Sequence, residues 1–166
     1  MRIVVCVKHV PDMQSERRFE GGRLVRGEDD VLNELDENAI EAAVQLKESE
    51  EDAGREAEVV ALTMGPEDAE DSLMRALQMG ADRAYIVSDE FLEGSDVITT
   101  ASVLSVAIAK IAQECGPVDL VLTGMASLDA MTSMLPAALA AKAHMPLLGL
   151  ARSLSVEGGA VTIERA

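Results

Sequence analysis

Residues 124–133 contain the residue types that could hold a phosphate group. They follow the short apolar run 118–123 and begin with Gly124, whose missing side chain would let the backbone approach a ligand closely. The hydroxyls of Thr132 and Ser133, together with the backbone amides before the next helix, could cradle an anion against the positive helix end. The same residues also suit an ordinary strand-to-helix loop in which Ser and Thr cap the helix. Spacing alone leaves both interpretations open.

Three methionines within or next to residues 124–133 could contact a nucleobase. Met125, Met131 and Met134 have flexible apolar side chains that could line an adenine ring. The chain has only two Phe, one Tyr and no Trp, which argues against aromatic stacking of bases. We therefore expect a ligand to be held by backbone atoms and aliphatic side chains. Other methionines fall on or near predicted core positions, namely Met64, Met74 and Met79.

Patterns for catalysis and metal binding are missing from the sequence. There is no GxGxxG after the first apolar run, no GxxxxGK[ST] and no GxSxG. The two histidines, His9 and His144, have no neighbouring Cys or His, which argues against a zinc site. His9 follows a strand end, where we expect a capped or solvated loop residue rather than a general base. The sequence thus predicts a binding protein with no catalytic residues and no metal.

Charge and composition restrict the possible partners. The chain has 30 acidic and 14 basic residues and a net charge of -16, which disfavours binding to nucleic acid or anionic lipid. Cys6 and Cys115 lack CxxC spacing and are expected to be reduced thiols. Residues 97–115 are interrupted by Thr, Ser and Lys110, so we expect a helix buried on most sides rather than a membrane span. Without a targeting segment at its start, the protein is expected to be cytoplasmic.

Four short runs rich in β-branched residues predict the strands that would position the candidate site. These runs do not alternate with polar residues, which indicates strands buried on both faces and hence a parallel sheet. Ligands bind such sheets at the carboxyl ends of the strands, where residues 124–133 begin. The predicted strands cover residues 3–7, 57–63, 83–87 and 118–123.

Helices are predicted between these strands, in one domain of 166 residues. Asn33 and Asp36 are good capping residues, so the first helix should begin near Asp36. The second should follow Gly65 with Pro66 at its first position, the third should cover 95–115, and the fourth 132–143 with Pro136 in its first turn. Residues 11–32 are expected to form a long surface loop, and residues 147–165 an antiparallel hairpin around Glu157-Gly158-Gly159.

Several blocks of the sequence resemble the electron transfer flavoprotein beta subunit. Residues 4–11 (VVCVKHVP) and 33–43 (NELDENAIEAA) are similar to the opening of that family. Residues 61–66 (ALTMGP) and 75–84 (RALQMGADRA) resemble its second strand, second helix and third strand, and residues 119–124 (DLVLTG) with Asp129 resemble its nucleotide loop. The resemblance implies an α/β fold with three layers, in which helices cover both faces of an open, mainly parallel sheet and an antiparallel hairpin follows. This arrangement is Rossmann-like and similar to the adenine nucleotide alpha hydrolases.

The resemblance also implies cofactors and partners. In this family the alpha subunit carries the redox FAD, and the beta subunit buries AMP, or a second FAD in the same pocket. The chain would then be a non-catalytic electron-carrier subunit in a heterodimer with the alpha subunit. The dimer would pass electrons from acyl-CoA-type dehydrogenases to a quinone or to a ferredoxin-side partner. The family's nucleotide contacts correspond here to Cys6, Asn33, Glu34, Leu35, Asp36, Met64, Gly124, Met125, Ala126, Ser127, Leu128, Asp129, Ala130, Met131, Thr132, Ser133, Met134 and Leu135.

Two features depart from the family pattern. Many members have Asp-Gly-Asp-Thr in the nucleotide loop, where this chain has Asp129-Ala130-Met131-Thr132. Members are also longer, so the resemblance covers their N-terminal nucleotide-binding part and the C-terminal part is missing. AMP and FAD both stay open as ligands. An alternative function is that of a stand-alone adenine-nucleotide sensor resembling universal stress proteins, whereas an adenylyltransferase is disfavoured because no HIGH-like or SGGxDS-like motif is present.

Overall fold

A four-stranded parallel sheet lies at the centre of the structure, a computed structural model that describes residues 1–165. Its strands stand in the order β7-β6-β1-β8. The four predicted strands are confirmed, with ends shifted by no more than two residues. Their bounds are β1 (Arg2–Cys6), β6 (Glu58–Met64), β7 (Arg83–Val87) and β8 (Leu120–Thr123).

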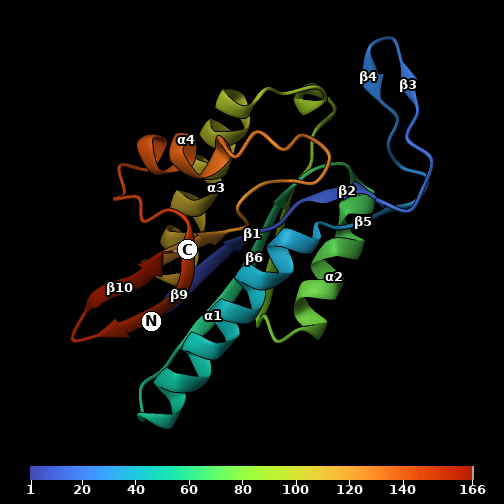
Figure 1. The fold of residues 1–166 in the computed structure, drawn as a ribbon. Coiled ribbons are helices and arrows are strands. Elements are labelled where there is room, and N and C mark those ends of the chain that lie inside the picture. The colour runs from blue at the N-terminus through green and yellow to red at the C-terminus, as the bar shows by residue number, and fades with distance from the viewer. Residues whose placement is uncertain (166) are drawn as a thin grey trace.

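Helices cover both faces of this sheet, so the predicted three-layer architecture is confirmed (Figure 1). One face carries α1 (Glu34–Asp52) and α2 (Glu70–Gln78). The other carries α3 (Val97–Cys115) and α4 (Leu135–Lys142). Single turns of 3₁₀-helix, η1 (Glu67–Ala69) and η2 (Glu90–Leu92), precede α2 and α3.

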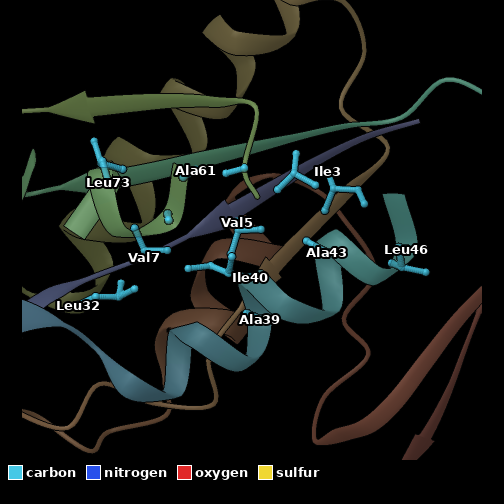
Figure 2. Packing of buried hydrophobic residues seen from close by; sticks show 13 residues of the cluster. Ile3, Val5, Val7, Leu32, Ala39, Ile40, Ala43, Leu46, Ala61 and Leu73 are labelled. Carbon is cyan, nitrogen blue, oxygen red and sulfur yellow. The ribbon is translucent and has the colours of Figure 1, made fainter. Parts of the chain in front are cut away.

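The core explains why the central strands are apolar without alternation. Successive side chains of a strand point to opposite faces. Ile3 and Val5 of β1 therefore pack against α1 and α2, while Val4 packs against α3 and α4. Figure 2 shows Ile40 and Ala43 of α1 facing β1. Both faces of β1 and β6 are buried, so an apolar residue is favoured at almost every position of these two strands.

Two helices begin at residues other than those predicted. The α-helix predicted from Pro66 begins at Glu70, because the residues before it form the 3₁₀ turn η1. The first helix begins at Glu34, near Asp36 as predicted, although the side chain of Asn33 makes no capping hydrogen bond. The fourth begins at Leu135 rather than at 132, because Met131 and Ser133 both have φ of 52°, a left-handed conformation that a right-handed helix cannot contain. Pro136 lies in the first turn, as predicted.

The chain between β1 and α1 contains four short strands instead of a structureless loop. β2 (His9–Pro11) pairs with β5 (Asp30–Leu32), and β3 (Phe19–Glu20) pairs with β4 (Arg23–Leu24). Gly21 and Gly22 turn between β3 and β4 with positive φ, and this ribbon projects from the body of the molecule (Figure 1). Strands of two or three residues are too short to leave a pattern in the sequence.

Helix α3 is less buried than expected. Only Ala101, Leu104, Ile108 and Ile111 are fully buried, and Val106 is 69% exposed. Among the described residues, α3 is also the one helix that is long and apolar enough to cross a membrane, with a mean hydropathy of 1.3. Its buried side chains pack on β6 and α4, as in a core helix of a folded domain. The prediction for Met74 was also wrong, because this side chain is exposed on α2.

The predicted C-terminal hairpin is confirmed, although it begins at Ala151 rather than at 147. It consists of β9 (Ala151–Glu157) and β10 (Ala160–Arg165), which pair antiparallel. Gly158 and Gly159 form the two-residue turn, and both have positive φ, as such turns require. Leu154 and Val156 of β9 pack against the cluster that includes α1.

Candidate functional site

The strand order locates the candidate site. From β1 the chain crosses to β6 on one side, whereas β8 lies on the other side of β1. The carboxyl ends of β1 and β8 therefore form a topological switch point, the place where open parallel sheets bind ligands. The first turn of α1 and the segment after β8 meet there. We refer to that segment, residues 124–134, as the β8 loop.

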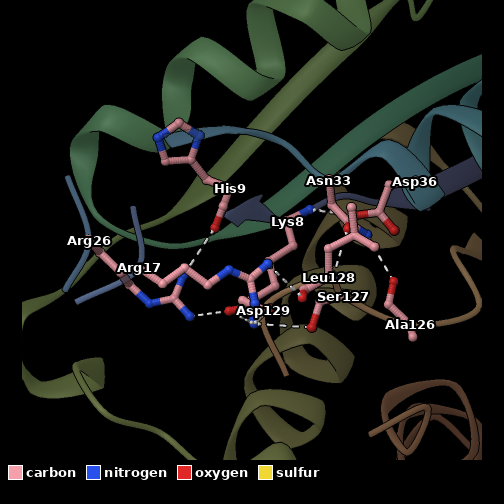
Figure 3. Close-up of polar contacts among 10 residues, drawn as sticks. All are labelled: Lys8, His9, Arg17, Arg26, Asn33, Asp36, Ala126, Ser127, Leu128 and Asp129. Carbon is pink, nitrogen blue, oxygen red and sulfur yellow. Dashed lines mark hydrogen bonds and ion pairs between the residues drawn. The ribbon is translucent and has the colours of Figure 1, made fainter. Parts of the chain in front are cut away.

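Asn33 joins these two segments through its side chain. Its Nδ2 donates a hydrogen bond to the carbonyl oxygen of Ala126 at 2.9 Å, and its Oδ1 accepts one from the amide of Leu128 at 3.0 Å (Figure 3). Asn33 is 1% exposed, so a missing partner would leave a buried polar group unsatisfied. Both ends of the amide are satisfied, which fixes the β8 loop against the start of α1.

Asp36 lies in the first turn of α1, three residues after Asn33, and is also buried. Its Oδ2 accepts a hydrogen bond from the amide of Lys8 at 2.8 Å. Burial raises the pKa of Asp36 to about 6, and hydrogen bonds from Asn33 and from the amides of Lys8 and Gly124 oppose this rise. Burial, with the negative charge of Asp36, raises the pKa of the Cys6 thiol to about 12. Cys6 is therefore a neutral packing group and not a nucleophile.

Position 124 requires a glycine because the backbone of α1 lies very close to it. A Cβ atom at this position would overlap Oδ1 of Asp36 and lie 2.9 Å from the carbonyl oxygen of Leu35. No other amino acid fits without moving the backbone of α1 away from β8. The glycine noted in the sequence thus permits two backbone segments to approach each other.

Asp129 is held by two cations. Its carboxylate lies 2.9 and 3.0 Å from Nζ of Lys8 and is paired with the guanidinium of Arg26. Burial raises the pKa of Asp129, but hydrogen bonds from Lys8, Arg26 and Ser127 outweigh this effect and leave the pKa below its usual value. Asp129 is therefore ionised at neutral pH.

The second half of the β8 loop is open to solvent. Residues 130–134 are exposed, and Met125, Met131 and Met134 each have more than half of their surface accessible. The amides of Ala130 and Met131 both donate to the carbonyl oxygen of Ser127, which makes a tight turn. The methionines predicted to line an adenine therefore have no packing partner that buries them.

The structure brings part of the predicted set together. Asn33, Asp36 and residues 124–129 meet at the switch point, with Cys6 buried next to Asp36. Glu34 and Leu35 also line a groove of about 710 Å³ between β5, α1 and α2. Met64 packs at the end of β6 against the α3 and α4 side of the sheet.

Contacts made by three basic residues were not predicted. Lys8, Arg17 and Arg26 all reach the β8 loop. Lys8 lies two residues after the end of β1, and that position is a usable signal in the sequence. The two arginines lie in the excursion between β2 and β5, whose path no sequence pattern indicates.

The histidines have structural surroundings. His9 is buried and its Nδ1 lies 2.7 Å from the hydroxyl of Ser72, so the expectation of a capped or solvated loop residue was wrong. This contact joins β2 to α2. His144 is exposed, with φ of 54° after α4. Within residues 1–165, no group of three or more His, Cys, Asp or Glu could hold a metal ion.

Replacement of Gly124 tests the close approach. We expect Gly124→Ala to lower the free energy of unfolding by about 1 to 3 kcal/mol, because the new Cβ overlaps α1. Gly149→Ala is the matched control, since a Cβ there meets nothing within 4 Å and Gly149 does not have positive φ. Urea unfolding of both variants measures the difference. Equal stability of the two variants would contradict the prediction.

Asp36 is expected to give the protein a specific pH dependence. Its pKa in the folded protein, about 6, lies above the ordinary value of 3.8. The stability it contributes is thus complete below pH 3.8 and is lost as the pH rises through 6. Between pH 4 and 7 the wild type should lose about 2 to 3 kcal/mol more than Asp36→Asn. Asp129 titrates below this window, and parallel curves in urea unfolding from pH 4 to 7 would refute the assignment.

Comparison with known proteins identifies the family. The electron transfer flavoprotein domain matches residues 22–166. The electron transfer flavoprotein subunit beta of Mycobacterium tuberculosis is 40% identical, over 98% of this chain and 61% of its own length. The same subunit of Megasphaera elsdenii is 38% identical over 99% of this chain and 61% of its own. The caffeyl-CoA reductase-Etf complex subunit CarD of Acetobacterium woodii is 35% identical, with coverage of 99% and 61%.

The chain thus spans about three fifths of the length of these relatives. The family match covers most of the chain, and the identities hold across nearly all of it. The protein therefore belongs to the electron transfer flavoprotein family and is related to its beta subunits.

Proposed function

We propose that this chain acts as the beta-type subunit of an electron transfer flavoprotein and binds AMP at the switch point. The observation that carries the proposal is the contact between Asn33 and the β8 loop, next to Gly124. This contact forms a rigid backbone frame from the two segments that correspond to the family's nucleotide contacts. The family relationship supports a nucleotide as the ligand of this frame.

The residues of the β8 loop suit the two halves of AMP. Thr132 and Ser133 are exposed directly before α4, so their hydroxyls and amides can bind a phosphate at the positive end of that helix. Met125, Met131 and Met134 are free to pack against the adenine ring, which would bury apolar surface now in contact with water. Backbone atoms around Gly124 can provide the remaining polar contacts.

AMP is preferred here to a second FAD. Asn33 holds the β8 loop directly against α1, with hydrogen bonds of 2.9 and 3.0 Å. Because the β8 loop and α1 are held this close together, we favour AMP, the smaller of the two ligands. This chain also has Met131 at the position where many members of the family carry an acidic residue, and the backbone of Met131 is left-handed. FAD in the same pocket is the other outcome of the test below.

In this proposal the chain itself performs no redox step. The FAD held mainly by an alpha subunit supplies the electron-transfer chemistry when bound, and this chain binds the nucleotide and docks the partner. Cys6 is a neutral buried thiol, and His9 is engaged by Ser72, so neither is available as a catalytic group. We further propose acyl-CoA-type dehydrogenases as donors, a quinone or ferredoxin-side acceptor, and the cytoplasm as the location.

The nucleotide content of the purified complex tests this function. The chain is copurified with its alpha partner and denatured, and the released nucleotides are measured by absorbance and mass spectrometry. We expect one AMP per copy of this chain and one FAD per alpha subunit. Two FAD molecules without AMP would show that FAD fills the pocket.

Variants of the frame provide the control for this measurement. Gly124→Ala should release less AMP, since its Cβ displaces the frame, whereas Gly149→Ala should release as much as the wild type. A complex that contains no adenine nucleotide beyond the FAD of the alpha subunit would refute nucleotide binding by this chain.

A further inference from the structure

The excursion between β2 and β5 contacts the β8 loop through two arginine side chains. We refer to residues 12–29, which include the β3–β4 ribbon, as the strap. Arg17 donates a hydrogen bond from Nη2 to the carbonyl oxygen of Leu128 at 3.3 Å. Arg26 pairs with Asp129 and also donates from Nη1 to the carbonyl oxygen of His9 at 3.5 Å. Figure 3 shows both arginines beside Lys8.

These contacts concentrate positive charge in an acidic protein. Lys8, Arg17 and Arg26 bring three positive charges to the β8 loop, and the carboxylates among them are Asp129 and Asp36. Among these contacting groups the positive charges outnumber the negative ones, although the chain as a whole carries a charge of -16. A positive region on an acidic surface attracts an anionic ligand.

Several other charged groups of the strap make contacts away from the β8 loop. Arg18 pairs with Glu28, and Arg23 pairs with Glu93 outside the strap. Asp29 accepts a hydrogen bond from the hydroxyl of Ser15, and Asp12 accepts one from the amide of Gln14. Arg17 lines a pocket that also includes the strap carboxylates Asp12, Glu16, Glu28 and Asp29, but none of these carboxylates forms an ion pair with Lys8, Arg17 or Arg26.

The cations keep donors for a further ligand. A guanidinium has five N–H donors, of which Arg17 uses one in these contacts and Arg26 uses two. The side chains of Lys8 and Arg26 are 40% and 39% exposed, whereas that of Asp129 is 1% exposed. Asp129 thus holds the two cations from inside, and their outer surfaces remain accessible.

We propose that Arg17 and Arg26 of the strap position the β8 loop and recognise the phosphate of its ligand, so that the site selects a phosphorylated nucleotide over the nucleoside. This inference rests on the proposed function, to which it adds the residues that read the phosphate. Arginine suits this role because its planar donors match phosphate oxygens.

A purely structural strap would behave differently. If the arginines only held the β8 loop in place, their removal would weaken AMP and adenosine alike. If they recognise the phosphate, their removal weakens AMP alone and reduces the salt dependence of its binding. The ratio of the two dissociation constants therefore separates the two roles.

Calorimetric titration of AMP and of adenosine tests the proposal. We expect Arg17→Ala/Arg26→Ala to weaken AMP by about tenfold or more, as the loss of charged hydrogen bonds predicts, with adenosine little changed. Arg17→Lys/Arg26→Lys should restore part of the AMP affinity, because it keeps the charge. Arg18→Ala is the matched control, since Arg18 pairs inside the strap. Arg17→Ala alone leaves the pairs of Asp129 intact and serves if the double variant fails to fold.

Three results would overturn the inference. An unchanged AMP affinity, or an equal loss for AMP and adenosine, would show that the arginines do not recognise phosphate, while nucleotide binding by the wild type would still support the proposed function. Failure of the wild type to bind either ligand would remove the proposed function and this inference with it.

Discussion

The position of β1 between β6 and β8 is the constraint on which the candidate site depends. It places the start of α1 beside the β8 loop, although more than ninety residues separate Asn33 from Leu128 in the sequence. Two backbone segments that approach so closely need a residue without a side chain, Gly124, and buried polar partners for their amides, which Asn33 and Asp36 provide. The close approach of the two segments therefore needs Gly124, Asn33 and Asp36 together. A buried amide left without its partner would cost more than the hydrogen bond itself contributes.

The two buried carboxylates of the site show how surroundings set ionisation. Asp36 is hydrogen-bonded mainly by neutral groups, and burial therefore dominates and raises its pKa. Asp129 is equally hidden, but Lys8 and Arg26 contact it directly and lower its pKa. One carboxylate thus makes the fold sensitive to pH near 6, while the other stays charged and anchors the strap.

Much of the fold could be predicted from local patterns, because strands buried on both faces leave continuous apolar runs and glycines mark the hairpin turn. The start of α4 could not, since the left-handed backbone of Met131 and Ser133 is imposed by the turn around Ser127. The contacts of the candidate site were harder to predict than the fold. Asn33 has the residue type of a helix cap, and sequence alone does not reveal that its side chain bonds to a distant loop. The β8-loop partners of Arg17 and Arg26 lie 111 and 103 residues away, and Ser72 lies 63 residues from His9.

The charges near the two helix starts determine how an anion would lie in the site. The β8 loop leads into α4 and is hydrogen-bonded to Asn33 directly before α1, and the start of each helix carries a positive partial charge. The first turn of α1 carries Glu34, Asp36 and Glu37, which offset that positive end, whereas the first turn of α4 has no acidic residue. The cations of the strap lie on the β8 loop, which leads into α4. Both effects act in the same direction and favour an anion near α4 and the strap over one at the start of α1.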